Sequence, residues 1–216
     1  MPQAHFIQVP KTARYYYLGS PGPHIQKLWY IIHGYGQLAG QFIKDFDILL
    51  DNHTLVVAPE ALHRFYLHGG SGPIGASWMT KEDRQHDIAD YLNHLNTIHD
   101  TISRLLHTTP RQITILGFSQ GVATACRWHA AGTIPTNRLL LWGSPIPTDL
   151  PFEDPATVAR FQTTDIHLIN GTNDPIYRSR QFQQTLTTLQ THNIPHHQTT
   201  FNGQHQIKPT ILAKFR

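Results

Sequence analysis

Short, continuous apolar runs recur along the chain and alternate with longer stretches whose apolar residues have helical spacing. Such runs are typical of parallel strands that are covered on both faces. We therefore expect buried strands at residues 28–32, 55–58, 113–116, 139–142 and 166–169. A more polar run, residues 196–201, is the expected last strand.

Apolar residues three and four positions apart predict helices between these strands. The longest predicted helix covers residues 81–107, with Thr80 as its expected N-cap, and the others are expected at residues 41–50, from 122 onward, 180–191 and 209–215. Near the start of the chain, alternation predicts a strand pair at residues 4–9 and 13–18, whereas residues 60–75 are expected to form a loop. The alternation of strands and helices predicts one α/β domain over residues 1–216, doubly wound, with a mostly parallel sheet, helices on both faces and no large cap domain.

Residues 117–121 read Gly-Phe-Ser-Gln-Gly and stand between a predicted strand and a predicted helix. This pattern in this context is typical of a nucleophile elbow, in which the glycines permit a tight turn. The turn exposes the serine hydroxyl at the carboxyl edge of the sheet, close to a helix N-terminus that favours negative charge. Ser119 is therefore the predicted nucleophile.

A serine nucleophile needs a histidine base and a carboxylate that orients the histidine, in the chain order serine, acid, histidine. His205 follows the last predicted strand at its carboxyl end, the edge where Ser119 is expected. Asp174 follows the strand at 166–169 at the same edge, in a short glycine-containing turn. Asp149 and Asp154, after the preceding strand, are the alternative acids. The sequence thus predicts a triad of Ser119, Asp174 and His205.

Acyl transfer also needs two N–H groups that bind the oxyanion. One comes from the residue after the nucleophile, Gln120, and the other from a loop after an earlier strand. Residues 33–37 form such a glycine-containing loop, in which Tyr35 is the expected donor. We expect His33 to brace this loop through a hydrogen bond rather than to act as a base.

These motifs, taken in order, resemble the carboxylesterase/phospholipase group of α/β-hydrolases, which includes acyl-protein thioesterases and small bacterial esterases. The matching segments are residues 33–36, 58–60, 76–78, 117–121, 142–147, 170–175 and 203–207. The resemblance implies an α/β-hydrolase fold and a serine carboxylic ester hydrolase that works without a cofactor through an acyl-enzyme intermediate. A departure is Asn170, which stands where the family often has histidine.

The expected acyl pocket is lined by Trp78, Met79, Phe65 and Tyr66. Because the chain has no insertion large enough for a cap domain, we expect an open site for small-molecule esters with short-to-medium acyl chains. Two alternatives stay open at this stage. The same triad serves thioesterases and lysophospholipases, and a hydrolase fold also occurs in catalytically idle binding proteins.

Composition and charge bear on the partners and the location that we expect for the protein. The net charge is only +3, without a basic block, so we expect no nucleic-acid partner. There is neither a secretory signal nor an apolar run of membrane-spanning length, and a cytoplasmic protein without integral membrane association is expected. Despite 16 histidines, no His-Glu-x-x-His helix is present, so we expect no metal. The oligomeric state is left open.

Overall fold

The predicted parallel strands form one central sheet in the computed structural model, which describes residues 2–177 and 179–216. The sheet has seven strands in the order β1-β3-β2-β6-β7-β8-β9, and its neighbouring pairs are parallel except β1 with β3. Apolar residues of the inner strands are almost all buried, which confirms the prediction from the apolar runs. The strands are β1 (Tyr15–Leu18), β2 (Lys27–Ile32), β3 (Thr54–Pro59), β6 (Gln112–Phe118), β7 (Arg138–Trp142), β8 (Asp165–Gly171) and β9 (His197–Phe201).

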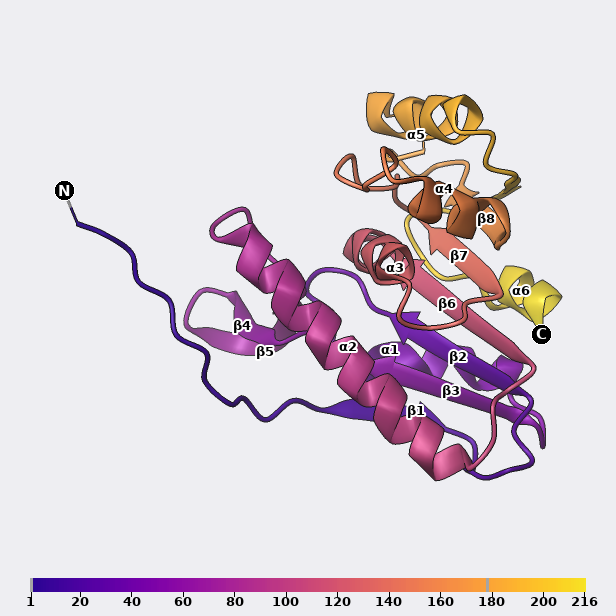
Figure 1. Ribbon diagram of the computed structural model, residues 1–216, viewed down its shortest axis with the longest axis horizontal. Coiled ribbons are helices and arrows are strands. Elements are labelled where there is room, and N and C mark those ends of the chain that lie inside the picture. Colours follow the sequence, from indigo (N-terminus) through magenta and orange to yellow (C-terminus); the bar gives the residue numbers. More distant parts are fainter. Residues whose placement is uncertain (1, 178) are drawn as a thin grey trace.

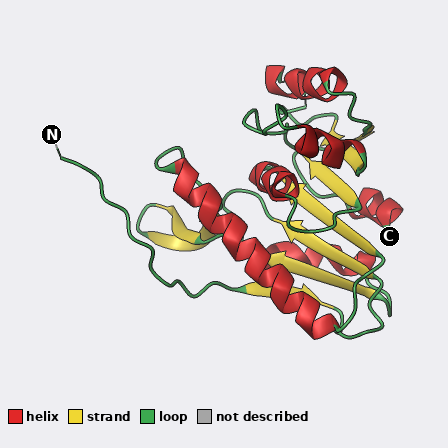
Figure 2. Ribbon diagram, viewed as in Figure 1, coloured by secondary structure: helices red, strands yellow, loops and turns green. Residues whose placement is uncertain are grey.

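Helices cover both faces of the sheet, and each face has its own hydrophobic core (Figures 1 and 2). Alternate residues of β2 show this division, because Leu28 and Tyr30 join one core while Trp29 and Ile31 join the other. The first core lies under α2 (Arg84–Leu106), α3 (Gln120–Ala131), α4 (Pro155–Gln162) and α5 (Arg180–Thr191). The second lies under α1 (Ala39–Phe42), the 3₁₀ helix η1 (Ile43–Leu49) and α6 (Pro209–Leu212), which the 3₁₀ turn η2 (Ala213–Phe215) follows. The doubly wound α/β prediction is confirmed.

The expected N-terminal strand pair is wrong in its first half. Residues 13–18 contribute β1, but residues 2–14 have no regular structure and extend away from the sheet (Figure 1). Alternation at residues 4–9 predicts a half-buried strand, yet Phe6 and Ile7 are exposed by 61% and 86%. A strand also needs a hydrogen-bonding neighbour, and β1 pairs with β3 instead of this segment.

The helix expected at residues 41–50 is divided into the short α1 and the 3₁₀ helix η1. The physical reason is the spacing of its apolar residues. Ile43, Phe46 and Leu49 are buried and three residues apart. This spacing matches a helix of three residues per turn, so the 3₁₀ form brings all three onto the core face.

The long helix begins later than expected. Asp83 is the N-cap residue of α2, in a left-handed conformation. Thr80 lies in the preceding turn, where its N–H donates to Asp87 Oδ2 at 3.0 Å and its hydroxyl donates to the Glu82 carbonyl at 3.1 Å. The Thr80 hydroxyl is therefore not available to cap α2.

The loop expected at residues 60–75 is a β-hairpin. Strand β4 (His63–His68) pairs antiparallel with β5 (Ser71–Ser77) across Gly69 and Gly70. A Gly-Gly pair between two short strands is a known hairpin signal. Within the described residues, the insertion after β3 is thus this hairpin and not a cap domain. None of the helices in residues 2–177 and 179–216 is long and apolar enough to cross a membrane.

His129 on α3 makes stability depend on pH. Its ring is 1% exposed and packs edge-on against Phe161, with 4.6 Å between ring centroids. Burial, together with Arg160, lowers the pKa of His129 to about 4. The folded protein keeps this ring neutral down to about that pH, whereas the unfolded chain protonates it near its ordinary value of 6.5. The unfolded state therefore binds more protons in this window, and stability is lost as the pH falls.

We expect His129 alone to lower the free energy of unfolding by roughly 2–3 kcal/mol between about pH 7 and about pH 4.5. Urea denaturation at several pH values measures this slope. His129→Leu removes the titrating group and should flatten the curve by that amount. An unchanged slope in this variant would contradict the assignment.

Candidate active site

Ser119 lies in a strained turn between β6 and α3. Its φ of 53° and ψ of −119° lie outside the regions that non-glycine residues usually adopt. A Cβ at Gly117 would lie 2.5 Å from the Gly121 carbonyl oxygen, and one at Gly121 would overlap the Ile32 carbonyl oxygen. Only glycine at both positions allows this close approach of strand, turn and helix. The structure therefore has the geometry of the predicted elbow.

Asp174 and His205 come together beside this turn, although 31 positions separate them in the sequence. His205 Nδ1 donates to Asp174 Oδ2 at 2.6 Å, and the Asp174 carboxylate is 2% exposed. The other oxygen, Oδ1, accepts from the Ile176 N–H at 2.9 Å, so the same side chain also closes its own turn. A buried carboxylate that accepts a hydrogen bond from one imidazole nitrogen is the arrangement that orients a catalytic base.

The His205 ring packs against Phe118, the residue before Ser119, with 4.9 Å between ring centroids. Gly143 at the end of β7 leaves room for it, because a Cβ there would lie 2.9 Å from His205 Cε1. Among the described residues, no hydrogen bond joins the Ser119 hydroxyl to the His205 ring. Such contacts are often long before substrate binds and shorten in the complex. The structure thus brings His205 to the elbow and orients it through Asp174.

The two alternative acids have other partners. Asp149 receives two hydrogen bonds from Arg127, at 2.8 and 3.3 Å, and one from Arg84 at 2.7 Å. Asp154 is the N-cap of α4, where it accepts from the backbone N–H groups of Ala156 and Thr157. Asp before Pro155 is a common helix-start signal, which explains a helix that the apolar spacing did not predict.

The loop after β2 lies against the elbow and offers a backbone donor. A Cβ at Gly34 would lie 3.1 Å from Ser119 Cβ. The Gly34 N–H donates to Gln37 Oε1 at 2.7 Å and the Gly36 N–H donates to the Ala76 carbonyl at 2.9 Å. Between them, the Tyr35 N–H has no acceptor among the described residues, and the N–H of Gln120 is equally unpaired at the start of α3. Both predicted oxyanion donors are therefore available.

His33 braces this loop through hydrogen bonds, as expected. Its ring is fully buried, with Nδ1 donating to the Gly34 carbonyl at 2.8 Å and Nε2 accepting from the Ala61 N–H at 3.1 Å. Burial lowers the pKa of His33, which keeps the ring in the neutral form that this pair of hydrogen bonds requires. The bracing role is confirmed.

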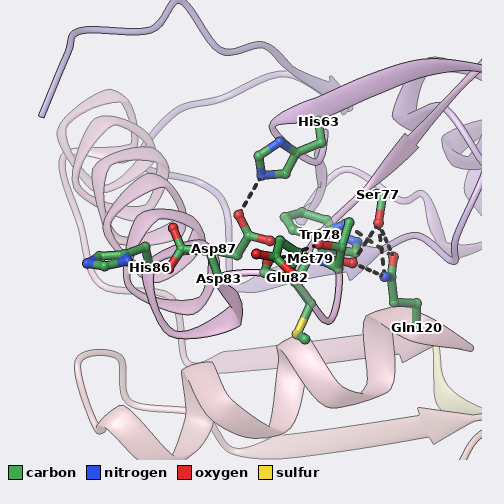
Figure 3. A network of polar contacts seen from close by, with 10 residues as sticks. His63, Ser77, Trp78, Met79, Glu82, Asp83, His86, Asp87 and Gln120 are labelled. Carbon is green, nitrogen blue, oxygen red and sulfur yellow. Dashed lines mark hydrogen bonds and ion pairs between the residues drawn. The ribbon is translucent and has the colours of Figure 1, made fainter. Parts of the chain in front are cut away.

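Figure 3 shows a role for the Gln120 side chain that sequence reasoning missed. Its Nε2 donates to Ser77 Oγ and to the Met79 carbonyl, both at 3.0 Å, while Oε1 accepts from the Trp78 N–H at 3.1 Å. The side chain thereby fixes the segment 77–79 next to the nucleophile. No local pattern signals this contact, because it joins residues more than 40 positions apart.

The cavity at Ser119 has a volume of about 330 Å³ and is lined by Met79, Thr80, Lys81, Ser119, Gln120, Ala123, Thr124, Arg127 and Ser144. Met79 is thus a wall residue, as expected. Ala123 and Arg127 lie four and eight positions after Ser119, and this spacing on a helix could have revealed them.

The other three predicted lining residues lie elsewhere. Trp78 is fully buried and donates from Nε1 to the His33 carbonyl at 2.9 Å, so it packs beneath the site. Phe65 on the β4–β5 hairpin packs against Tyr35 with 33° between the ring planes, and Tyr66 is 50% exposed on the same strand. Trp78 cannot form a pocket wall because neighbouring residues cover it, whereas Phe65 and Tyr66 lie on the hairpin and do not line the cavity.

Comparisons with known proteins identify the family and the fold of the chain. A sequence model of the phospholipase/carboxylesterase family matches residues 19–216. No curated protein matches the chain. Among solved structures, acyl-protein thioesterase 2 from Zea mays is similar with a TM-score of 0.71 at 16% identity, covering 94% of this chain and 97% of the other.

Two bacterial structures are similar in the same way. A phospholipase/carboxylesterase from Dyadobacter fermentans has a TM-score of 0.66 at 19% identity, covering 96% of this chain and 97% of its own. A carboxylesterase from Bacillus cereus has a TM-score of 0.65 at 16% identity, covering 94% and 91%. At these identities the likeness concerns the fold.

Proposed function

Because the chain belongs to the phospholipase/carboxylesterase family of serine hydrolases, we propose that it hydrolyses small carboxylic esters with short-to-medium acyl chains through Ser119, His205 and Asp174. The observation that supports this most strongly is the 2.6 Å hydrogen bond between Asp174 and His205 beside the strained Ser119. Each of the three residues lies at the carboxyl edge of the sheet, where reactive groups gather in this class of fold.

In the proposed reaction, the Ser119 oxygen attacks the acyl carbonyl while His205 Nε2 takes the hydroxyl proton. The N–H groups of Tyr35 and Gln120 donate to the oxyanion that forms on the carbonyl oxygen. His205 then passes its proton to the leaving alcohol, and the acyl-enzyme remains. A water molecule, activated by the same imidazole, releases the carboxylic acid and restores Ser119. Asp174 keeps Nδ1 protonated throughout, so that Nε2 is free to accept.

The size of the cavity supports the proposed acyl length. A volume of about 330 Å³ lies at the lower end of the roughly 300–1,000 Å³ that is usual for ligand sites. Met79 gives it one apolar wall. The remaining lining is mostly small or polar, which offers a long alkyl chain little apolar surface to cover.

The test is hydrolysis of p-nitrophenyl esters from acetate to palmitate. We expect kcat/KM to increase with chain length only while the cavity buries the added methylenes, each worth about 0.8 kcal/mol, and to increase no further from medium chains to palmitate. A maximum at palmitate would contradict the proposed substrate class. Matched oxygen esters, thioesters and lysophospholipids with the same acyl group would assign the preferred leaving group.

A further inference from the structure

Two histidines and one aspartate meet at the edge of the sheet opposite the active site. His167 on β8 and His197 on β9 are directly paired in the strand register, and Asp165 lies two positions before His167 on the same face of β8. His167 Nε2 is 2.7 Å and His197 Nε2 is 3.8 Å from Asp165 Oδ1. The two rings stack with 4.7 Å between centroids and 22° between planes. Three donor atoms thus lie within 4.8 Å of one another.

We propose that the Asp165–His167–His197 cluster binds a divalent transition-metal ion such as Zn²⁺. Two imidazole nitrogens and one carboxylate oxygen form a donor set that suits zinc and its neighbours rather than calcium or magnesium. The sequence-based expectation of no metal considered ligands on a single helix. This cluster instead spans two strands that are 30 residues apart at the paired histidines, so only the strand register brings it together.

The spacing of the donor atoms is close to what such an ion requires. Tetrahedral ligands about 2.0–2.2 Å from zinc lie roughly 3.3–3.6 Å from one another. The two oxygen–nitrogen distances, 2.7 and 3.8 Å, lie on either side of this range. The His197 side chain is 70% exposed, so its ring is free to move closer. Binding requires the tautomer in which the neutral His167 ring carries its proton on Nδ1, so that Nε2 is free for the ion, and water completes the coordination.

Surrounding groups hold the cluster in place. Arg138 Nε donates to Asp165 Oδ2 at 2.8 Å and leaves Oδ1 for the ion. Phe215 packs edge-on against the His167 ring, with 4.9 Å between centroids. Contacts of this kind around a metal site orient its ligands. The Arg138 charge also opposes a cation, so the affinity should be lower than that of closed zinc sites with four protein ligands.

The position points to a structural role. Strand β8 begins at Asp165, whereas Asp174 follows its far end, about 20 Å away at the usual rise per strand residue. An ion at the cluster would join the edge strand β9 to β8 without contact with the reacting groups. It should therefore raise stability and leave ester hydrolysis independent of added metal.

Calorimetric titration of the full chain with Zn²⁺ tests the proposal. We expect one equivalent that His197→Gln weakens at least tenfold and that the double variant His167→Asn/His197→Gln abolishes. His68→Gln, which removes an exposed strand histidine outside the cluster, should keep that equivalent. Saturation at about 100 times Kd should raise the Tm by roughly 5–10 °C in the wild type and in His68→Gln, and should not change it in the double variant.

Equal Zn²⁺ stoichiometry and affinity in the wild type and in His197→Gln would overturn the proposal. This variant is a safe test because the His197 side chain is mostly exposed and its loss leaves the core intact. Loss of ester hydrolysis on treatment with a chelator, with the circular dichroism of the folded protein unchanged, would overturn the structural role, because it would place a metal ion in the reaction. The proposed metal site is supported if the double variant no longer binds Zn²⁺. Its structural role is supported if ester hydrolysis by the wild type is insensitive to the chelator.

Discussion

Replacement of Ser119 by alanine is expected to lower kcat for ester hydrolysis by at least about 10⁴-fold and up to about 10⁶-fold. The variant lacks the oxygen that forms the acyl-enzyme, so attack falls to a water molecule that the site does not position. The N–H groups of Tyr35 and Gln120 remain in place and account for the residual rate over water. Stopped-flow measurement with a p-nitrophenyl ester should show an initial burst in the wild type that the variant lacks.

The stability of the Ser119→Ala variant distinguishes a loss of catalysis from a loss of fold. Ser119 already adopts a φ of 53°, and alanine has a similar backbone cost there, so the Tm should change little. Ser103→Ala, on the exposed side of α2, is the matched control and should retain wild-type rates. A phosphonate ester that labels serine nucleophiles should modify the wild type at Ser119. A label at another serine, or full activity of Ser119→Ala, would remove Ser119 from the proposed mechanism.

The sequence predicts the position of a residue well where one local rule determines that position. A strand, two glycines and a helix predict Ser119, and the carboxyl ends of their strands predict His205 and Asp174. The structure brings these last two into contact because β8 and β9 are adjacent and parallel. The apolar runs succeeded for a related reason, since burial on both faces demands continuous apolar residues.

Where tertiary contacts determine the structure of a segment, the sequence pattern alone does not predict it. Residues 4–9 carry a strand pattern but have no neighbouring strand, and η1 follows a three-residue spacing that a helix pattern also allows. The Gln120 side chain meets residues 77–79 only after α3 and β5 have packed. Likewise, the Asp165–His167–His197 cluster depends on the register of β8 with β9, which periodicity alone does not specify. Local patterns thus locate the candidate site residues at one edge of the sheet, and packing determines what surrounds them.

The second substitution with a large expected effect is at Asp174, the acid of the proposed triad. Asp174→Asn is expected to lower kcat by about 10⁴-fold with little change in KM, because the substrate contacts remain but the base is held in the wrong tautomer. The Ile176 N–H donates to Oδ1 at 2.9 Å and so keeps the amide oxygen at that position. The amide NH₂ must then face His205 Nδ1. An imidazole that accepts at Nδ1 carries its proton on Nε2, where it cannot take one from Ser119.

Asp149→Asn is the matched control, because it changes the rival acid in the same way. This substitution weakens the ion pairs of Asp149 with Arg127 and Arg84, and since the Arg127 side chain is only 9% exposed, its charge loses much of its compensation. We therefore expect a lower midpoint in urea denaturation but a rate loss of less than about tenfold. If Asp149→Asn lost the larger factor while Asp174→Asn stayed active, the acid would be Asp149. Single-turnover kinetics on both variants distinguish the cases, because a wrong tautomer slows acylation itself whereas a loosened ion pair lowers the fraction of folded enzyme.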